Sequence, residues 1–157
     1  MKITFLWIGK TSEGWLKEGI LEYEKRLRHY IPLSVQIIPA PKNLPRQDID
    51  KQKEIEGDTI LQQIDPGEQV FLLDERGKSY TSEGLASFLQ QKMLASVKSL
   101  VFVVGGPFGF SPKVYQRANG QIAFSELTFS HQMIRLLLCE QVYRAFTIIR
   151  GESYHHS

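Results

Sequence analysis

The sequence predicts an α/β domain in which helices flank a mostly parallel sheet, and three observations indicate this class. Short β-prone runs alternate with amphipathic stretches of helical spacing along the chain. Two runs, Gln69 to Leu73 and Leu100 to Val104, are almost entirely apolar, as in strands that a parallel sheet buries on both faces. No internal repeat or Pro/Gly-rich linker interrupts the 157 residues, so we expect a single domain over residues 1–157.

The first half of the chain predicts strand, helix, strand and helix in that order. Ile3 to Ile8 is a β-prone run, and apolar residues recur at helical spacing from Ser12 to about Tyr30. Leu33 to Ile38 indicates a second strand, because a proline bounds it on each side. Asp48 is placed to cap a second helix, which the turn residues Asp65-Pro66-Gly67 end near Ile64.

The second half of the chain continues this alternation. After the strand from Gln69 to Leu73 we expect a polar loop from Asp74 to Lys78, and Ser82 is the expected N-cap of the next helix. The remaining predicted elements are a strand from Leu100 to Val104, a short helix from Pro112 to about Asn119, a short strand from Ile122 to Phe124 and a long helix from Ser130 to about Ile148.

Composition excludes several classes of protein. The chain is 42% hydrophobic and 23% charged, which is a globular composition, and its formal charge of +2 does not by itself indicate nucleic-acid binding. A single cysteine, Cys139, excludes a disulfide framework and favours a reducing compartment. The adjacent His155 and His156 lack the spacing of a metal site, so no metal is expected. No apolar stretch approaches the roughly 18 residues of a membrane span, and the apolar run at the N-terminus is too short for a signal peptide. We therefore expect a cytoplasmic protein without a membrane partner.

The loops after Leu73, Val104 and Phe124 are the places to look for a ligand. In open α/β sheets, ligands bind beyond the carboxyl ends of the strands. The loop from Gly105 to Gly109 contains three glycines, which fits either a tight turn or a backbone that approaches a nucleotide-like ligand closely. Neither a phosphate-binding loop nor a dinucleotide fingerprint matches its spacing.

The segment from Phe124 to Gln132 is the second candidate. Ser130 is placed to cap the long helix, but capping does not explain why Glu126, His131 and Gln132 gather here as well. We therefore favour a functional role for this segment.

The long helix that follows is apolar on nearly all sides. This pattern fits a central core helix or a subunit interface, and in so small a domain we favour self-association.

Several ordered motifs together resemble a known family. They are Leu72-Leu73-Asp74-Glu75-Arg76-Gly77-Lys78, Val103-Val104-Gly105-Gly106-Pro107-Phe108-Gly109, Ser125-Glu126-Leu127-Thr128-Phe129-Ser130-His131-Gln132-Met133-Ile134-Arg135, Glu140-Gln141-Val142-Tyr143-Arg144-Ala145 and a terminal Tyr154-His155-His156. The chain closely resembles, over its whole length, the RlmH (YbeA-type) family of small SPOUT-class RNA methyltransferases. One departure is Ser153, which stands where the family usually has a proline.

The resemblance implies a fold, a cofactor and a substrate. The fold would be a SPOUT-type α/β domain with a C-terminal trefoil knot, assembled as a homodimer that binds S-adenosylmethionine. The reaction would methylate N3 of a pseudouridine in large-subunit (23S) ribosomal RNA within assembled ribosomes. Carried over residue by residue, the cofactor contacts fall on Leu73, Gly105, Gly106, Glu126, Leu127, Thr128, Phe129, Ser130 and His131.

The implied chemistry suggests catalytic residues. An imide N–H is a poor nucleophile until its proton leaves, so a general base or a cation near the developing anion should matter. Our hypothesis is that Tyr154 and His155, folded over the cofactor pocket, orient the base and assist deprotonation, with Arg135 as an electrostatic partner. A local basic face for RNA could be formed by Lys25, Arg26, Arg28, His29, Lys42, Arg46, Arg144 and Arg150.

Two other functions stay open at this stage. The glycine loop and the polar segment could hold a nucleotide or RNA in a ribosome-associated binding module that performs no chemistry. A nucleotide-dependent enzyme acting on a small molecule is a second alternative, although the sequence has no phosphate-binding fingerprint.

Overall fold

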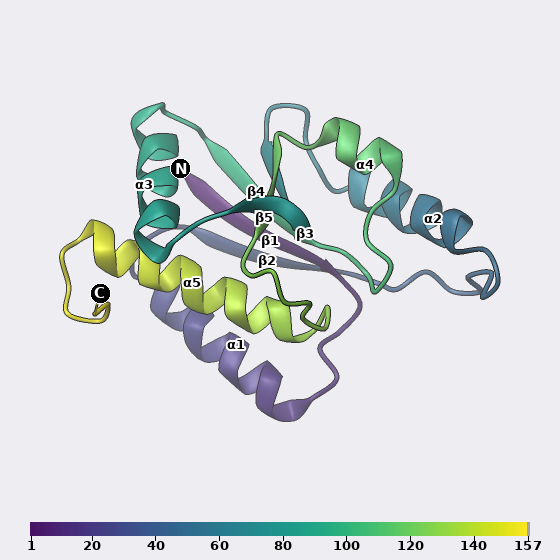
Figure 1. The fold of residues 1–157 in the computed structure, drawn as a ribbon, viewed down its shortest axis with the longest axis horizontal. Helices are drawn as coiled ribbons and strands as arrows, with labels where there is room; N and C mark the ends of the chain where they lie inside the picture. Colours follow the sequence, from purple (N-terminus) through teal and green to yellow (C-terminus); the bar gives the residue numbers. More distant parts are fainter. Residues whose placement is uncertain (157) are drawn as a thin grey trace.

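Residues 1–156, which this computed structural model describes, contain one five-stranded sheet with all pairs parallel, in the order β2-β1-β4-β3-β5 (Figure 1). The strands are β1 (Lys2–Ile8), β2 (Leu33–Ile38), β3 (Gln69–Ser79), β4 (Ser99–Val104) and β5 (Gly120–Ala123). The predicted class, an α/β fold with a mostly parallel sheet, is therefore confirmed. The trefoil knot stays a prediction.

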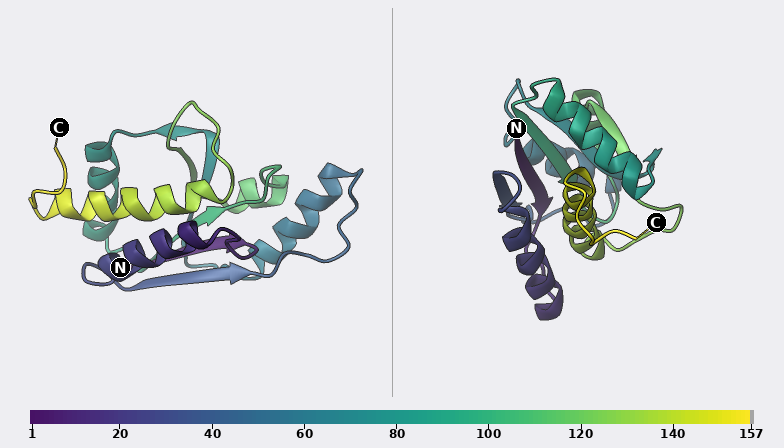
Figure 2. Two further views of the ribbon diagram at one scale, coloured as in Figure 1. Left: turned by 90° about the horizontal axis from the view of Figure 1, so that it is seen from below. Right: turned by 90° about the vertical axis from the view of Figure 1, so that its left-hand side faces the viewer.

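Helices cover both faces of the sheet (Figures 1 and 2). The first face carries α1 (Gly14–Leu27), α3 (Ser82–Leu94) and α5 (Met133–Ile149), and the second carries α2 (Ile49–Leu61) and α4 (Pro112–Arg117). Side chains alternate between the faces along each strand, so that Phe5 and Phe102 enter the core under the first set and Leu6 and Val103 the core under the second. Double-sided burial explains why β1 and β4 are apolar throughout.

The segment from Asp74 to Lys78 is strand rather than the predicted polar loop. The β3 pairing with β5 shifts register between Leu73 and Lys78, and both of these residues lie opposite Ile122. Such a bulge lets a strand carry extra residues without ending. Gly77 passes so close to the β5 backbone that a Cβ there would lie 2.6 Å from the Gln121 carbonyl carbon. The polar composition of residues 74–78 therefore predicted the end of this strand wrongly.

The cap of α3 also differs from the prediction. Thr81, not Ser82, is the N-cap, and its hydroxyl accepts a hydrogen bond from the Gly84 N–H at 3.0 Å. The Ser82 hydroxyl instead donates to Gln141 on α5. The predicted cap of α2 is confirmed, since the Asp48 carboxylate accepts from the Lys51 N–H.

The long helix α5 lies in the middle of the first helical layer. It packs between α1 and α3 and against the sheet, with Leu138, Cys139, Val142 and Ala145 fully buried. It begins at Met133, three residues later than expected, while the Ser130 hydroxyl accepts the Met133 N–H. Contacts within the chain therefore explain much of its apolar character, which by itself does not require a second copy.

In residues 1–156, none of the helices combines the length and the apolar character that crossing a membrane demands.

The role of Thr81 as the N-cap of α3 can be tested by measuring stability. Replacing Thr81 with alanine leaves the Gly84 N–H without its acceptor, so we expect the free energy of unfolding to fall by about 1 kcal/mol. Thr81→Ser keeps an accepting hydroxyl and should behave like the unmodified protein. Urea denaturation followed by circular dichroism measures both. Equal stability of the alanine and serine variants would contradict this assignment.

Candidate active site

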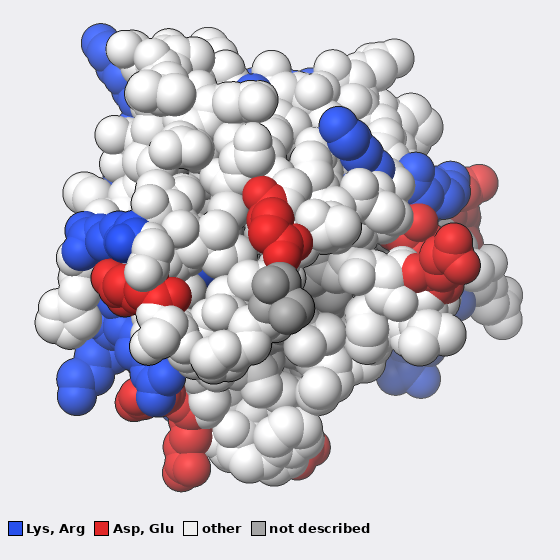
Figure 3. Space-filling view, turned by 60° about the vertical axis from the view of Figure 1, so that its left-hand side comes forward, with Lys and Arg blue, Asp and Glu red and all other residues white. Residues whose placement is uncertain are grey.

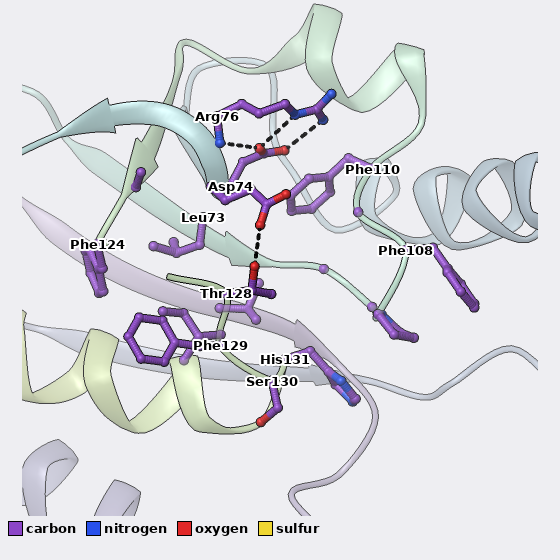
Figure 4. A pocket seen from close by; sticks show the side chains of 18 of the residues that line it. Leu73, Asp74, Arg76, Phe108, Phe110, Phe124, Thr128, Phe129, Ser130 and His131 are labelled. Carbon is purple, nitrogen blue, oxygen red and sulfur yellow. Dashed lines mark hydrogen bonds and ion pairs between the residues drawn. The ribbon is translucent and has the colours of Figure 1, made fainter. Parts of the chain in front are cut away.

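The irregular part of β3 at residues 73–76 and the two turns at the carboxyl ends of β4 and β5 enclose a cavity of about 750 Å³ (Figure 4). Its walls include Leu73, the glycine loop Gly105–Gly109 and most of the segment 124–131. The volume lies within the roughly 300–1,000 Å³ of small-molecule sites. The turns after β4 and β5 that the strand-end rule selected therefore line one cavity, and residues 73–76 line it from within β3.

The structure brings most of the predicted cofactor residues together. Those that line the cavity are Leu73, Gly105, Gly106, Leu127, Thr128, Phe129, Ser130 and His131. Glu126 belongs to the same segment but is exposed and does not line the cavity.

The glycine loop is a tight turn that also forms a cavity wall. The Gly106 carbonyl accepts the Gly109 N–H at 3.3 Å, and Gly109 has a φ of 81°, which residues with a side chain rarely adopt. The tight turn is therefore confirmed, and the approach of this backbone to a nucleotide-like ligand stays a prediction.

The mouth of the cavity combines exposed apolar side chains with polar groups. Phe108 is 50% exposed, Leu127 73% and Phe129 38%, which is unusual for neighbouring large apolar residues. Deeper in, burial and the Arg135 cation lower the pKa of His131, so its imidazole is neutral at pH 7. The site is suited to an apolar, aromatic ligand.

A cluster of hydrogen-bonded polar side chains at the edge of the cavity was not predicted from the sequence. The Asp74 carboxylate accepts hydrogen bonds from the Arg76 backbone N–H and guanidinium and from the Tyr115 hydroxyl. These bonds lower the pKa of Asp74 despite its burial. Nearby, the Thr128 hydroxyl donates to Glu75 at 2.9 Å and joins the 124–131 segment to β3 (Figure 4). Asp74 was part of a recognised motif, but Tyr115 lies on α4 and no sequence signal linked the two.

Arg135 is buried at the start of α5. Its guanidinium donates to the carbonyls of Ile8, Gly9 and His131, at 2.6, 3.0 and 3.2 Å, and to the Thr11 hydroxyl. Burial lowers its pKa to about 10, so it keeps its charge at neutral pH. The described contacts give Arg135 a positioning role, and they do not place it beside Tyr154.

The C-terminal tail docks on the helical layer rather than over the cavity of its own chain. The Tyr154 hydroxyl donates to Glu140 on α5 and shares a hydrogen bond with Tyr23 on α1. His155 lies 2.8 Å from Glu83 on α3. None of these partners lines the cavity. The catalytic role of Tyr154 and His155 therefore stays a prediction.

Several residues of the predicted basic face are engaged within the chain. Arg26 pairs with Glu22, Arg28 with Glu24, and Arg144 with Glu140. Arg150 lies over the ring of Tyr30. These pairings reduce the positive charge that α1 and α5 offer to RNA.

In residues 1–156, no group of three or more His, Cys, Asp or Glu side chains is arranged to hold a metal ion.

Comparison with known proteins places this chain in a family. Residues 1–155 match a family model described as "Predicted SPOUT methyltransferase". The chain belongs to the SPOUT methyltransferase family. Its relatives include proteins named "Ribosomal RNA large subunit methyltransferase H" from Parabacteroides distasonis, which is 51% identical over 156 residues with 99% of each chain covered, and from Cytophaga hutchinsonii, which is 48% identical with 99% of this chain and 100% of that one covered.

A solved structure has a related fold. It is titled "The structure of a probable methylase family protein from Haemophilus influenzae Rd KW20" and aligns with a TM-score of 0.52 at 10% sequence identity, covering 99% of this chain and 70% of the other. At this identity the likeness concerns the fold alone. For a SPOUT methyltransferase, the cavity between the β3 bulge and the turns after β4 and β5 is the candidate active site.

The positioning role of Arg135 can be tested by stability. Arg135→Lys replaces a planar group of five N–H donors by one ammonium, so some of the four acceptors lose their partner. We expect the free energy of unfolding to fall by about 2–3 kcal/mol, measured by urea denaturation. As a control, Arg26→Lys alters an exposed pair and should cost less than about 1 kcal/mol. A similar small loss in both variants would refute the role.

Proposed function

We propose that this SPOUT methyltransferase transfers the methyl group of S-adenosylmethionine to N3 of a pseudouridine in large-subunit (23S) ribosomal RNA. It would act in the cytoplasm on assembled ribosomes and as a homodimer. Relatives about half identical over nearly the whole chain, all named for methylation of this RNA, support ribosomal RNA as the substrate. The convergence of the β3 bulge and the turns after β4 and β5 on one cavity is the observation that carries the proposal.

The cavity residues fit a nucleoside methyl donor. The apolar part of the cavity wall is formed by Leu73, Val104 and Ile122, next to turns whose backbone comes close to the cavity. Two aromatic side chains, Phe108 and Phe129, lie at the mouth. An aromatic base prefers such apolar and aromatic surroundings, while backbone groups of the turns can hydrogen-bond to its edge. When bound, the donor supplies a methyl group that already carries a good leaving group.

The protein's task is then chiefly alignment and proton removal. In-line displacement needs the nucleophile and the methyl carbon held in one geometry, and well-oriented groups can lower such a barrier by several kcal/mol, up to about 11. The nucleophile must also lose its N3 proton. Neutral His131 on the cavity wall and the tail residues Tyr154 and His155 are the groups of this chain available for that step.

Docking of the tail away from its own cavity supports a homodimer in which each tail serves the other copy. Tyr154 is held by Glu140 and Tyr23, and the helical layer around them exposes large apolar residues, with Trp15 59% and Leu21 53% exposed on α1. In the view of Figure 3, most charged side chains lie toward the two margins, an acidic side chain stands near the centre, and much of the remaining area is uncharged. Such a surface suits packing against another protein surface better than contact with RNA phosphates.

Recognition of a whole ribosome fits the weak charge of the chain. With a formal charge of +2 and several arginines already paired, the electrostatic attraction to free RNA is small. Shape complementarity to an assembled particle would supply the missing affinity.

The proposed reaction can be tested with labelled S-adenosylmethionine and ribosomes from cells that lack this protein. We expect one methyl group per ribosome, mapped by mass spectrometry to N3 of a pseudouridine of the large-subunit RNA. Protein-free RNA should be methylated at least about tenfold more slowly, because the phosphate contacts of so weakly charged a chain contribute little. Methylation of another base, or efficient methylation of an isolated stem-loop, would contradict the proposal.

The shared site predicts complementation between two defective copies. A Tyr154→Phe/His155→Ala chain keeps its cavity. A Gly106→Leu chain keeps its tail but displaces the glycine wall of its cavity, because a Cβ at Gly106 would stand 2.7 Å from a Glu56 oxygen. Each variant alone should have little activity on ribosomes. When the two are mixed and allowed to exchange subunits, activity should return, because the heterodimer contains one complete site.

The control is a mixture of the tail variant with a chain that carries the tail and cavity substitutions together, which should stay inactive. Near-normal turnover of the tail variant by itself would remove the tail from the mechanism. Mixing without any gain would show that each tail serves its own chain.

A further inference from the structure

Phe108 is the most exposed of the nine phenylalanines of the chain. It lines the cavity together with Leu127 and Phe129, which are also large apolar residues exposed to solvent. Single apolar side chains on a surface are common, but three at the mouth of one cavity form a patch that marks a binding surface. Within residues 1–156, Phe108 belongs to neither of the two cores, so packing does not explain its position.

The turn that carries Phe108 holds the ring in a defined place. Gly106 and Gly109 form an antiparallel bridge, and Pro107 and Phe108 are the two residues at the tip between them (Figure 4). The pyrrolidine ring of Pro107 fixes the φ of that residue. Directly behind the tip, Phe110 is 4% exposed in the core under α2 and α4. A side chain on so well anchored a turn loses little conformational entropy when a ligand packs on it.

A cation lies on the helix that packs against the same turn. A Cβ built on Gly106 would stand 2.7 Å from an oxygen of Glu56, so this face of α2 contacts the turn. Lys53, one helical turn earlier on that face, lines the cavity. Its ammonium group lies 3.7 Å from the carboxylate of Asp50, which is almost fully exposed, and such a pair contributes little. Lys53 can therefore exchange Asp50 for an anion that arrives at the mouth.

The reaction requires a nucleobase to reach this mouth. N3 lies on the pairing edge of a uracil ring, and enzymes that modify such an atom take the nucleotide out of its stack. With the methyl donor inside the cavity, the extruded base has to approach it through the mouth. That base has lost its stacking neighbours, and an aromatic side chain can replace one of them. The phosphate groups beside the base prefer a cation, so an aromatic ring with a nearby lysine fits RNA better than an apolar segment of protein.

We propose that the extruded target base stacks on Phe108 at the mouth of the cavity, and that Lys53 binds a phosphate group of the same RNA segment. This inference rests on the proposed function. It assigns recognition of the RNA to the tip of the turn after β4 and to α2, and it leaves the interior of the cavity to the methyl donor.

The test separates recognition of the RNA from binding of the donor. Methyl transfer to ribosomes from cells that lack this protein gives kcat/KM for the RNA substrate, and calorimetry with S-adenosylhomocysteine gives the affinity of the donor site. In Phe108→Ala we expect kcat/KM for ribosomes to fall by about 5- to 150-fold, which is the loss that removal of one base–aromatic stack causes. The Kd of S-adenosylhomocysteine should stay within about twofold, because the ring lies outside the interior of the cavity.

Further variants distinguish stacking from apolar bulk. Phe108→Trp keeps an aromatic face and should be as active as the unmodified protein, whereas Phe108→Leu keeps apolar volume without a ring and should lose nearly as much as Phe108→Ala. Lys53→Met keeps the length of the side chain but not its charge. It should lower the slope of log(kcat/KM) against log[salt] by about one, as the loss of one phosphate contact does.

Controls exclude effects on folding and assembly. Leu94→Ala truncates a side chain that is 79% exposed at the end of α3 and outside the cavity wall, and it should leave kcat/KM unchanged. Phe108→Ala should unfold at the same temperature as the unmodified protein, because its ring lies outside both cores. Sedimentation should show the same oligomeric state for both proteins.

Several outcomes would overturn the inference while the proposed function stands. Unchanged kcat/KM in Phe108→Ala, or full activity in Phe108→Leu, would show that no base stacks on the ring. An equal loss of affinity for S-adenosylhomocysteine would assign the ring to the donor, and a changed oligomeric state would assign it to contact with a second copy of the chain. An unchanged salt slope in Lys53→Met would remove Lys53 from the contact. If the unmodified protein does not methylate ribosomes, the proposed function fails and this inference fails with it.

Discussion

The burial of the Arg135 guanidinium at the end of β1 is the constraint on which the rest of the site depends. A charged group is expensive to remove from water, and here three backbone carbonyls and a hydroxyl replace the water. Because those carbonyls belong to Ile8 and Gly9 at the end of β1 and to His131, the arginine fixes the start of α5 beside the first strand. The segment between β5 and α5 must then pass the β3 bulge and the end of β4, and this crossing closes the cavity.

Much of the fold could be predicted because its signals are local. Apolar runs such as Leu100 to Val104 identified central strands, and the order of strands and helices identified the parallel sheet. The general rule for ligands in such sheets then selected the segments after Leu73, Val104 and Phe124, and all three line one cavity, although the first continues strand β3. The prediction worked where a residue's environment follows from its immediate neighbours in the chain.

The features that sequence reasoning missed depend on residues far apart in the chain. The extension of β3 requires Gly77 to pass the β5 backbone, which no property of the segment 74–78 reveals. The sequence suggested that Arg135 is a cation available for catalysis, because its hydrogen-bond acceptors at Ile8 and Gly9 lie more than a hundred residues away in the chain.

The docked position of Tyr154 constrains how it can act. Burial, together with hydrogen bonds to Tyr23 and Glu140, raises the pKa of its hydroxyl above the ordinary value, so in this position it is a hydrogen-bond donor and not a base. A positive charge nearby has the opposite effect on a phenol. The sulfonium of a methyl donor carries such a charge, and it would lie in the cavity of the other copy. If Tyr154 takes part in proton removal, it must therefore leave Glu140 and enter that second environment, so that undocking of the tail and arrival of the donor become coupled steps.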